Sequence, residues 1–228
     1  MRVLGIETST PWCGVALWDD AGPVASRAFV NHMELSARLV PTIERMLSEE
    51  KLALTDMHGI AVSLGPGSFT GLRIGVATAK TLAQVAGLPV IGVDTMDSVA
   101  LPYEPLARGG TCLVVTMSAR RGFYYVRWYS RGECDTDRTI RMLSTDELRE
   151  RLALATSPVL LLGDAALREG LTGTGMPILA GAHHPHALNA AYIGHERLVK
   201  GEIDDPLTLT PLYVGRSAAE ERREGYRP

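Results

Sequence analysis

The chain has 228 residues, of which 46% are hydrophobic and 21% charged, a composition typical of a globular protein with a sizeable core. Its formal net charge of −3 disfavours a strongly basic nucleic-acid binder, because neutralising phosphates takes a surplus of Lys and Arg. No apolar run approaches the ~20 residues of a membrane span and no signal peptide is evident, so a cytoplasmic protein without a membrane anchor is expected.

The first part of the chain alternates strand-like and helix-like patterns. Three β-type runs come first, and Asp19-Asp20-Ala21-Gly22 predicts a hairpin turn between the second and third. A helix with apolar residues at 3.6-residue spacing follows, and Pro41 is expected to kink it or limit its first turns. Strand, loop, helix and strand then predict a βαβ crossover. The predicted strands are residues 2–7, 14–18, 24–30, 60–64 and 89–93, and the predicted helices are 35–47 and 72–86.

The second part has weaker patterns. Strands are predicted at residues 111–117, 123–129 and 158–162, and helices at 144–152 and 187–200. Ser144 or Thr145 is expected to cap the first of these helices, with Glu147 near its third position. Residues 170–185 predict a surface loop and residues 217–228 a frayed, charged tail. A composition shift at residues 101–110 predicts two domains, 1–100 and 101–228, with helix 187–200 left free to return to the first.

The first strand ends in an acid followed by small hydroxyl residues, namely Glu7, Thr8 and Ser9. Hydroxyls and turn amides can donate to a phosphate, and a carboxylate can orient water or a cation. The alternative is a capped turn before Pro11.

A glycine-rich loop, Gly65-Pro66-Gly67-Ser68-Phe69-Thr70-Gly71, opens the helix at 72–86. Glycines allow close backbone approach at a helix N-terminus, so the loop could hold an anion. It matches neither the Walker A nor the Gly-x-Gly-x-x-Gly pattern, and a tight turn with helix capping is equally compatible.

A small residue stands at every fourth position of that helix, at Gly71, Gly75, Ala79 and Ala83. Such a stripe lets another helix approach closely, and glycine inside a helix costs ~1 kcal/mol, so Gly75 needs a packing reason. The approaching helix is either 35–47 of the same chain or a helix of another chain.

The remaining candidate groups favour structural roles. Cys13, Cys112 and Cys134 are too widely spaced for a disulfide framework or zinc site and predict buried, reduced thiols. His183, His184 and His186 lack a local carboxylate partner, so no metal site is expected. Arg120 and Arg121, close to aromatic residues, predict a solvated hairpin tip, with an RNA-stacking surface as the alternative.

Ordered motifs along nearly the whole chain resemble the TsaB (YeaZ) family of the actin–hexokinase ATPase superfamily. The most specific is the glycine loop with the Leu-Arg-Ile-Gly that follows it. The others are Gly5-Ile6-Glu7-Thr8-Ser9, Glu34-Leu35-Ser36, Leu39-Val40-Pro41-Thr42-Ile43, Ala119-Arg120-Arg121-Gly122, Pro211-Leu212-Tyr213 and Ala219-Glu220.

This resemblance implies a two-lobed, ribonuclease-H-like α/β fold with mixed sheets flanked by helices. It implies a non-catalytic subunit that binds and supports TsaD, the enzyme that transfers a threonylcarbamoyl group to adenosine 37 of tRNAs reading ANN codons. TsaE is the third, ATP-hydrolysing member. A homodimer is expected where TsaD is absent, and tRNA contact only through the complex. ATP or ADP at the complex interface is left open.

The resemblance also implies site residues. Where TsaD has a His-x-x-x-His metal pair, residues 93–98 contain no histidine, so neither metal nor catalytic residues are expected. The residues expected to face TsaD from the two helices are Leu35, Leu39, Ile43, Met46, Gly71, Gly75, Ala79 and Ala83. The residues expected to form a vestigial or shared nucleotide site are Glu7, Thr8, Ser9, Gly65, Gly67 and Ser68.

Two positions depart from the family pattern: Ser118 stands where Asp is common, and Phe123 where Glu is common. The alternative function is an active ATPase or peptidase of the same superfamily, based on the two phosphate-like loops. A stand-alone tRNA binder is disfavoured by the net charge.

Overall fold

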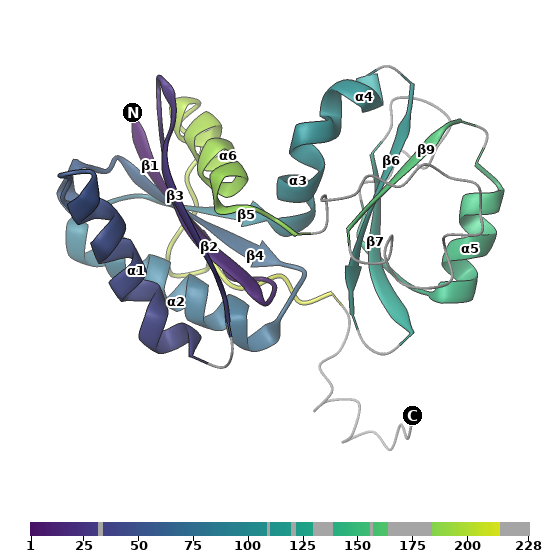
Figure 1. Cartoon of the computed structure of the whole chain (residues 1–228), viewed down its shortest axis with the longest axis horizontal. Coiled ribbons are helices and arrows are strands. Elements are labelled where there is room, and N and C mark those ends of the chain that lie inside the picture. The colour runs from purple at the N-terminus through teal and green to yellow at the C-terminus, as the bar shows by residue number, and fades with distance from the viewer. Residues whose placement is uncertain are drawn as a thin grey trace.

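The computed structural model has two lobes, each built around one β-sheet (Figure 1). This arrangement of mixed sheets flanked by helices is the α/β fold class expected from the sequence. None of the described helices is both long enough and apolar enough to cross a bilayer. The structure describes residues 1–31, 34–108, 110–119, 122–129, 139–155, 157–163 and 184–214.

The first sheet combines an antiparallel meander with a parallel crossover. Its strands are β1 (Arg2–Glu7), β2 (Trp12–Asp19), β3 (Gly22–Val30), β4 (Gly59–Gly65) and β5 (Val90–Asp94), in the order β3-β2-β1-β4-β5. β2 pairs antiparallel with β1 and β3, which confirms the predicted meander. Gly22 closes its hairpin turn with a φ of 122°, a conformation that favours glycine. β4 pairs in parallel with β1 and β5, which confirms the predicted crossover.

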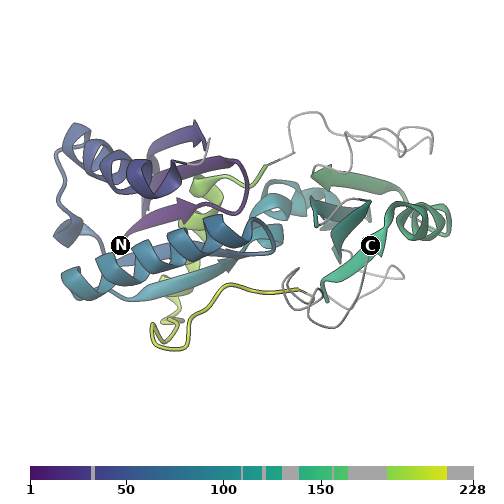
Figure 2. The ribbon, with the colours of Figure 1, turned by 90° about the horizontal axis from the view of Figure 1, so that it is seen from below.

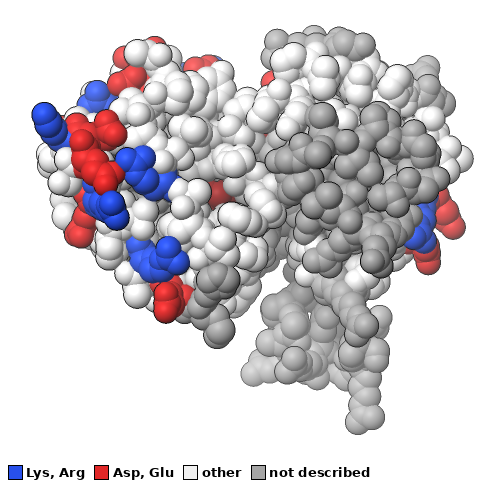
Figure 3. Space-filling view, viewed as in Figure 1, with Lys and Arg blue, Asp and Glu red and all other residues white. Residues whose placement is uncertain are grey.

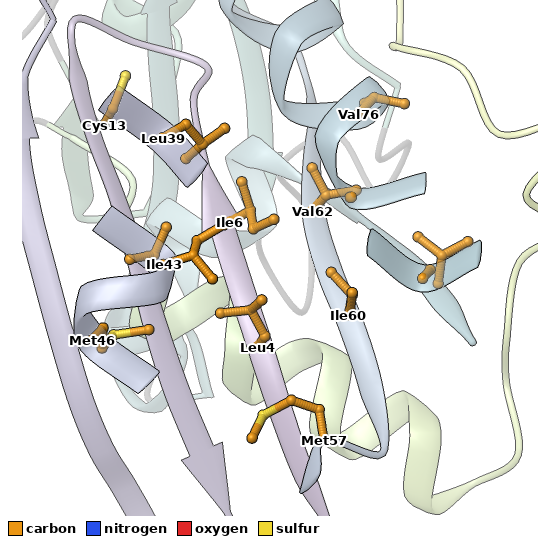
Figure 4. Close-up of a cluster of buried hydrophobic side chains, with 14 of the residues drawn as sticks. Leu4, Ile6, Cys13, Leu39, Ile43, Met46, Met57, Ile60, Val62 and Val76 are labelled. Carbon is orange, nitrogen blue, oxygen red and sulfur yellow. The ribbon is translucent and has the colours of Figure 1, made fainter. Parts of the chain in front are cut away.

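Two helices, α1 (Leu35–Glu49) and α2 (Phe69–Ala86), cover one face of this sheet side by side (Figures 1 and 2). The helices and strands share a buried apolar core, drawn in Figure 4. Pro41 lies inside α1, which continues to Glu49. Pro41 and Ala37 are both exposed, so water can satisfy the Ala37 carbonyl that loses its helical donor. Core members include Leu4, Ile6, Leu39, Ile43, Met46, Val62 and Val76.

A single helix near the end of the chain, α6 (Ala187–Val199), covers the opposite face (Figure 1). Small residues bring it directly onto the strands. A methyl group added at Gly5 would lie 2.5 Å from the carbonyl oxygen of Ala187, and one at Gly194 would lie 2.4 Å from Cβ of Ala61. The first lobe is therefore completed by residues far away in the sequence.

The second sheet contains β6 (Cys112–Ser118), β7 (Phe123–Tyr129), β8 (Arg141–Ser144) and β9 (Val159–Gly163), in the order β8-β7-β6-β9. β6 pairs antiparallel with β7 and parallel with β9. Helix α5 (Thr145–Ala153) buries Leu148 and Leu152 against one face. The predicted cap is confirmed by two hydrogen bonds. The backbone N–H of Glu147 donates to the Ser144 hydroxyl, and the backbone N–H of Ser144 donates to the Glu147 carboxylate.

The segment between the sheets is helical, although the sequence predicted a boundary poor in core residues. It contains α3 (Thr95–Ala100), the 3₁₀ turn η2 (Leu101–Tyr103) and α4 (Glu104–Arg108). Met96 and Val99 of α3 pack against the second sheet. A division at residue 100 stays a prediction, because α3 belongs to the second core while α6 packs on the first sheet.

After α6, residues 204–214 run back along the first lobe, and we call them the C-terminal strap (Figure 2). Asp204 forms a β-bridge with Val90, Leu209 joins the core beneath α1 and α2, and the N–H of Leu212 donates to the carbonyl of Leu64. The strap therefore passes beside the loop that opens α2.

Candidate functional site: a buried polar seam and an exposed helix face

The predicted nucleotide residues at the carboxyl end of β1 form part of a buried polar seam, which we define as Glu7, Thr8, Ser9 and Ser63. All four residues are at most 1% exposed. The backbone N–H of Ser9 donates to Glu7 Oε1 at 2.6 Å, and that of Thr8 to Ser63 Oγ at 3.3 Å. The structure thus brings Glu7, Thr8 and Ser9 together at the carboxyl end of a strand.

The glycine loop packs directly on this seam. The N–H of Ser68 donates to the carbonyl of Ser9 at 2.6 Å. A methyl group at Gly67 would lie 2.3 Å from that carbonyl oxygen, and one at Gly71 would lie 2.1 Å from the carbonyl oxygen of Thr8. The glycines therefore make room for the chain's own backbone, which is the packing alternative raised by the sequence.

The seam holds polar atoms that the described residues leave without hydrogen-bond partners: Glu7 Oε2, Thr8 Oγ1 and Ser9 Oγ. Burial raises the pKa of Glu7, although several hydrogen bonds oppose the shift. Burial and the charge of Glu7 also raise the pKa of the neighbouring Cys13 thiol to about 12, so Cys13 is not a ready nucleophile.

These contacts do not fit a nucleotide cradle built from the seam. Glu7, Thr8 and Ser9 are covered by the chain itself, so a phosphate would have to displace the loop to reach them. Ser68 is exposed, and its hydroxyl accepts from the N–H of Gly71 as the cap of α2. The predicted set therefore does not line an open phosphate pocket, and no chemical step is assigned to a nucleotide here.

The structure corrects the prediction that one set of residues on α1 and α2 faces a partner. They are buried, and the six with side chains beyond glycine are at most 2% exposed. The apolar stripe of each helix packs on the first sheet, so these side chains cannot be presented to another chain in this fold. The corrected residues are Leu35, Leu39, Ile43, Met46, Gly71, Gly75, Ala79 and Ala83.

Several small side chains are exposed on the sides of these helices that do not pack on the sheet. We define the exposed helix face by Ala37, Pro41 and Glu44 on α1 and Thr70, Ala77 and Thr81 on α2; longer exposed side chains such as Arg45 and Gln84 lie on the same helices. Because most of these side chains are small, a helix of another chain could approach the backbones of α1 and α2 closely here.

Charges of both signs intermingle at the side of the first lobe (Figure 3). Arg27 of β3 and Arg45 of α1 both pair with Glu49, at 2.6 and 2.8 Å. No field of one sign is built around these pairs, so this side offers little to a phosphate backbone.

An aromatic–arginine cluster borders the exposed helix face. Phe69 and Tyr213 are 45% and 49% exposed, and their ring centroids lie 5.4 Å apart. The Arg73 guanidinium carbon lies 3.9 Å from the Phe69 centroid, and Arg73 Nε donates to the Tyr213 hydroxyl at 3.1 Å. Arg73 lies in the Leu-Arg-Ile-Gly motif and Tyr213 in the motif Pro211-Leu212-Tyr213. Nothing in the sequence indicated that the C-terminal strap brings these two motifs together.

The other sequence candidates do not assemble a reactive site. His184 contacts Trp12 at a ring-centroid distance of 5.3 Å, and His186 precedes α6. Within the described ranges, no group of three or more His, Cys, Asp or Glu side chains is placed to hold a metal. Cys13 and Cys112 are buried, as expected. The predictions for Arg120, Arg121, Cys134, His183, Ala219 and Glu220, for most of the loop at 170–185 and for the tail at 217–228 lie outside the described residues.

Comparisons with known proteins give a matching family model and several relatives. The model of the family TsaD, tRNA N6-adenosine threonylcarbamoyltransferase, matches residues 27–157. The tRNA threonylcarbamoyladenosine biosynthesis protein TsaB of Bacillus subtilis (strain 168) is 30% identical over 231 residues, which cover 97% of each chain. The chain belongs to the TsaB family.

Two further comparisons concern a second relative and a solved structure. TsaB of Escherichia coli (strain K12) is 39% identical over 133 residues, which span 58% of this chain and only 57% of that protein. The solved structure of YeaZ from Pseudomonas aeruginosa has a TM-score of 0.76 at 24% identity and covers 93% of this chain and 99% of its own, a likeness of fold.

Proposed function

We propose that this chain is a non-catalytic subunit in the synthesis of N6-threonylcarbamoyladenosine at position 37 of tRNAs reading ANN codons. In this proposal it binds TsaD directly, works with TsaE in the same complex, and contacts tRNA only through that complex, in the cytoplasm. The observation that carries the proposal is the match to a TsaB protein along nearly the full length of both chains.

The structure supports a binding role through the exposed helix face. Ala37 and Ala77 are small exposed residues on neighbouring helices, so a partner helix could approach their backbones closely. The aromatic–arginine cluster at the border of this face has the residue types that dominate binding energy at interfaces. The same face could bind a second copy of this chain where TsaD is absent.

The test is tRNA modification reconstituted from this chain, TsaD and TsaE with ATP, each omitted in turn. Modification is expected to require this chain, and Ala77→Arg is expected to weaken TsaD binding at least about tenfold by placing a charge in the contact. Ala153→Arg, on an exposed turn of α5, is the matched control and should bind normally. Full modification without this chain, or normal binding by folded Ala77→Arg, would contradict the proposal.

The alternative is an active ATPase or peptidase. It rests on the loops at Glu7–Thr10 and Gly65–Gly71, and the close contacts of Gly67 and Ser68 with Ser9 favour the packing interpretation of these loops. Nucleotide or peptide turnover by the purified chain that disappears in Glu7→Ala, with the fold retained, would support this alternative.

A further inference from the structure

One arginine of the second lobe contacts a carboxylate at the end of the first sheet and a second carboxylate in α3. Arg127 of β7 places Nη2 2.8 Å from Asp94 Oδ2 and Nη1 3.0 Å from Asp97 Oδ1. The hydroxyl of Tyr129, also on β7, donates to Asp97 Oδ1 at 2.7 Å. We call Arg127, Tyr129, Asp94 and Asp97 the latch.

The Arg127–Asp94 pair of the latch is largely shielded from water. The side chains of Arg127 and Asp94 are 11% and 19% exposed, while that of Asp97 is 40% exposed. Burial raises the pKa of Tyr129 well above its usual range, so the phenol keeps the proton that it donates to Asp97. Removing one member of a largely buried ion pair is costly, because its partner charge is left uncompensated.

Asp94 connects the latch to the element between the lobes. Its Oδ1 accepts from the N–H of Met96 at 2.8 Å and so caps the start of α3, while its Oδ2 holds Arg127. A shift of the second lobe that broke the Arg127 contact would therefore disturb the same carboxylate that orders α3.

α3 itself contacts both lobes. Met96 and Val99 lie in the apolar core against the second sheet. On another side, the amide of Asn189 in α6 donates to the carbonyl of Ser98 at 2.8 Å. The segment where a hinge would be placed is thus packed on one lobe and hydrogen-bonded to the other.

We propose that the latch fixes the two lobes in one relative orientation, so that they move as a single body and not as two lobes that open and close. The Arg127–Asp94 pair bridges the lobes, Tyr129 and Asp97 of α3 hold Arg127 beside it, and α3 replaces a flexible linker with a packed element. The inference does not depend on the proposed function.

The test measures the distance between the lobes by double electron–electron resonance on the full chain. Spin labels attached through an unnatural ketone amino acid at Val85 and Leu154, which are 79% and 81% exposed, report on α2 and the end of α5 and leave the native cysteines in place. The unaltered chain should give one narrow distance distribution. Arg127→Met, which keeps the apolar stem but not the charge, should widen it at least about twofold.

Arg45→Met is the matched control, because Arg45 is 80% exposed and pairs with Glu49 inside the first lobe. It should leave the distribution unchanged. A broad distribution in the unaltered chain, or an unchanged one in Arg127→Met, would overturn the proposal. If Arg127→Met fails to fold by circular dichroism, Asp94→Asn decides instead, because it keeps an oxygen that can cap α3 but loses the charge that holds Arg127. Widening supports the latch, and an unchanged distribution overturns it.

Discussion

At the residue scale, Gly75 and Thr8 make one of the tightest contacts in the first lobe. A methyl group at Gly75 would lie 2.1 Å from Thr8 Oγ1, an atom without a hydrogen-bond partner among the described residues. Gly75 of α2 therefore leaves space for Thr8, the residue directly after β1. Its helix-propensity cost of ~1 kcal/mol is offset by the approach it permits.

Gly75→Ala tests this contact. The methyl group should destabilise the fold by about 1–3 kcal/mol despite the better helix propensity of Ala, because the core around Thr8 is closed. Urea unfolding measures the change. Thr8→Ala removes the clashing hydroxyl, so the double variant should be more stable than Gly75→Ala alone. Gln84→Ala, exposed on the same helix, should stay within about 0.5 kcal/mol of the unaltered chain.

Glu7 predicts a pH dependence of stability. Its folded pKa is raised above the ordinary 4.5, so the folded state binds this proton more tightly and loses stability as the pH rises through the folded pKa. Glu7→Gln keeps an oxygen acceptor for the Ser9 N–H without the charge. Its free energy of unfolding relative to the unaltered chain should therefore increase from about pH 4 to about pH 8. A difference that does not change with pH would show that Glu7 gains no proton on folding.

At the scale of elements, α5 depends on its first turn. Ser144 and Glu147 exchange hydrogen bonds in a capping box, and the bonds from Ser144 lower the pKa of Glu147. Ser144→Ala should cost about 1 kcal/mol in the free energy of unfolding. Glu150→Ala, exposed on the same helix, is the control and should have little effect. Equal stabilities of the two variants would mean that the cap contributes nothing to the second lobe.

Elements with long periodic patterns could be predicted from the sequence, and short or context-dependent ones could not. The meander, the crossover and helices α1, α2, α5 and α6 follow from spacing and turn residues. α3 spans six residues and β8 four, too few to show a period, and α3 is fixed by the Asp94 cap and by packing. Periodicity also identified the apolar faces of α1 and α2, but it did not identify what packs against them. A sheet of the same chain and a helix of another chain both require apolar residues at these positions.

At the scale of the whole molecule, the first lobe is not a self-sufficient unit. Val3, Ala61 and Val93 are buried under Ala190 of α6, nearly a hundred residues beyond the end of β5. Tertiary burial of this apolar face is needed to stabilise the sheet.

A fragment of residues 1–110 is therefore expected to lack cooperative thermal unfolding. Joining residues 184–214 to this fragment through a flexible linker should restore a cooperative transition, because α6 then covers the bare face while the strap pairs with β5 and adds Leu209 to the core under α1 and α2. Differential scanning calorimetry compares the two. Cooperative unfolding of the shorter fragment alone would show that α6 is dispensable for the first lobe.

The position of α6 has a consequence during synthesis on the ribosome. β1 and β4 emerge early, but the helix that covers them leaves the exit tunnel only after more than a hundred further residues have been synthesised. Throughout that interval, one side of a nearly complete sheet is exposed to the crowded surroundings of the nascent chain. Contacts of such large sequence separation slow folding, so the newborn first lobe is open to chaperone binding and aggregation until α6 has emerged.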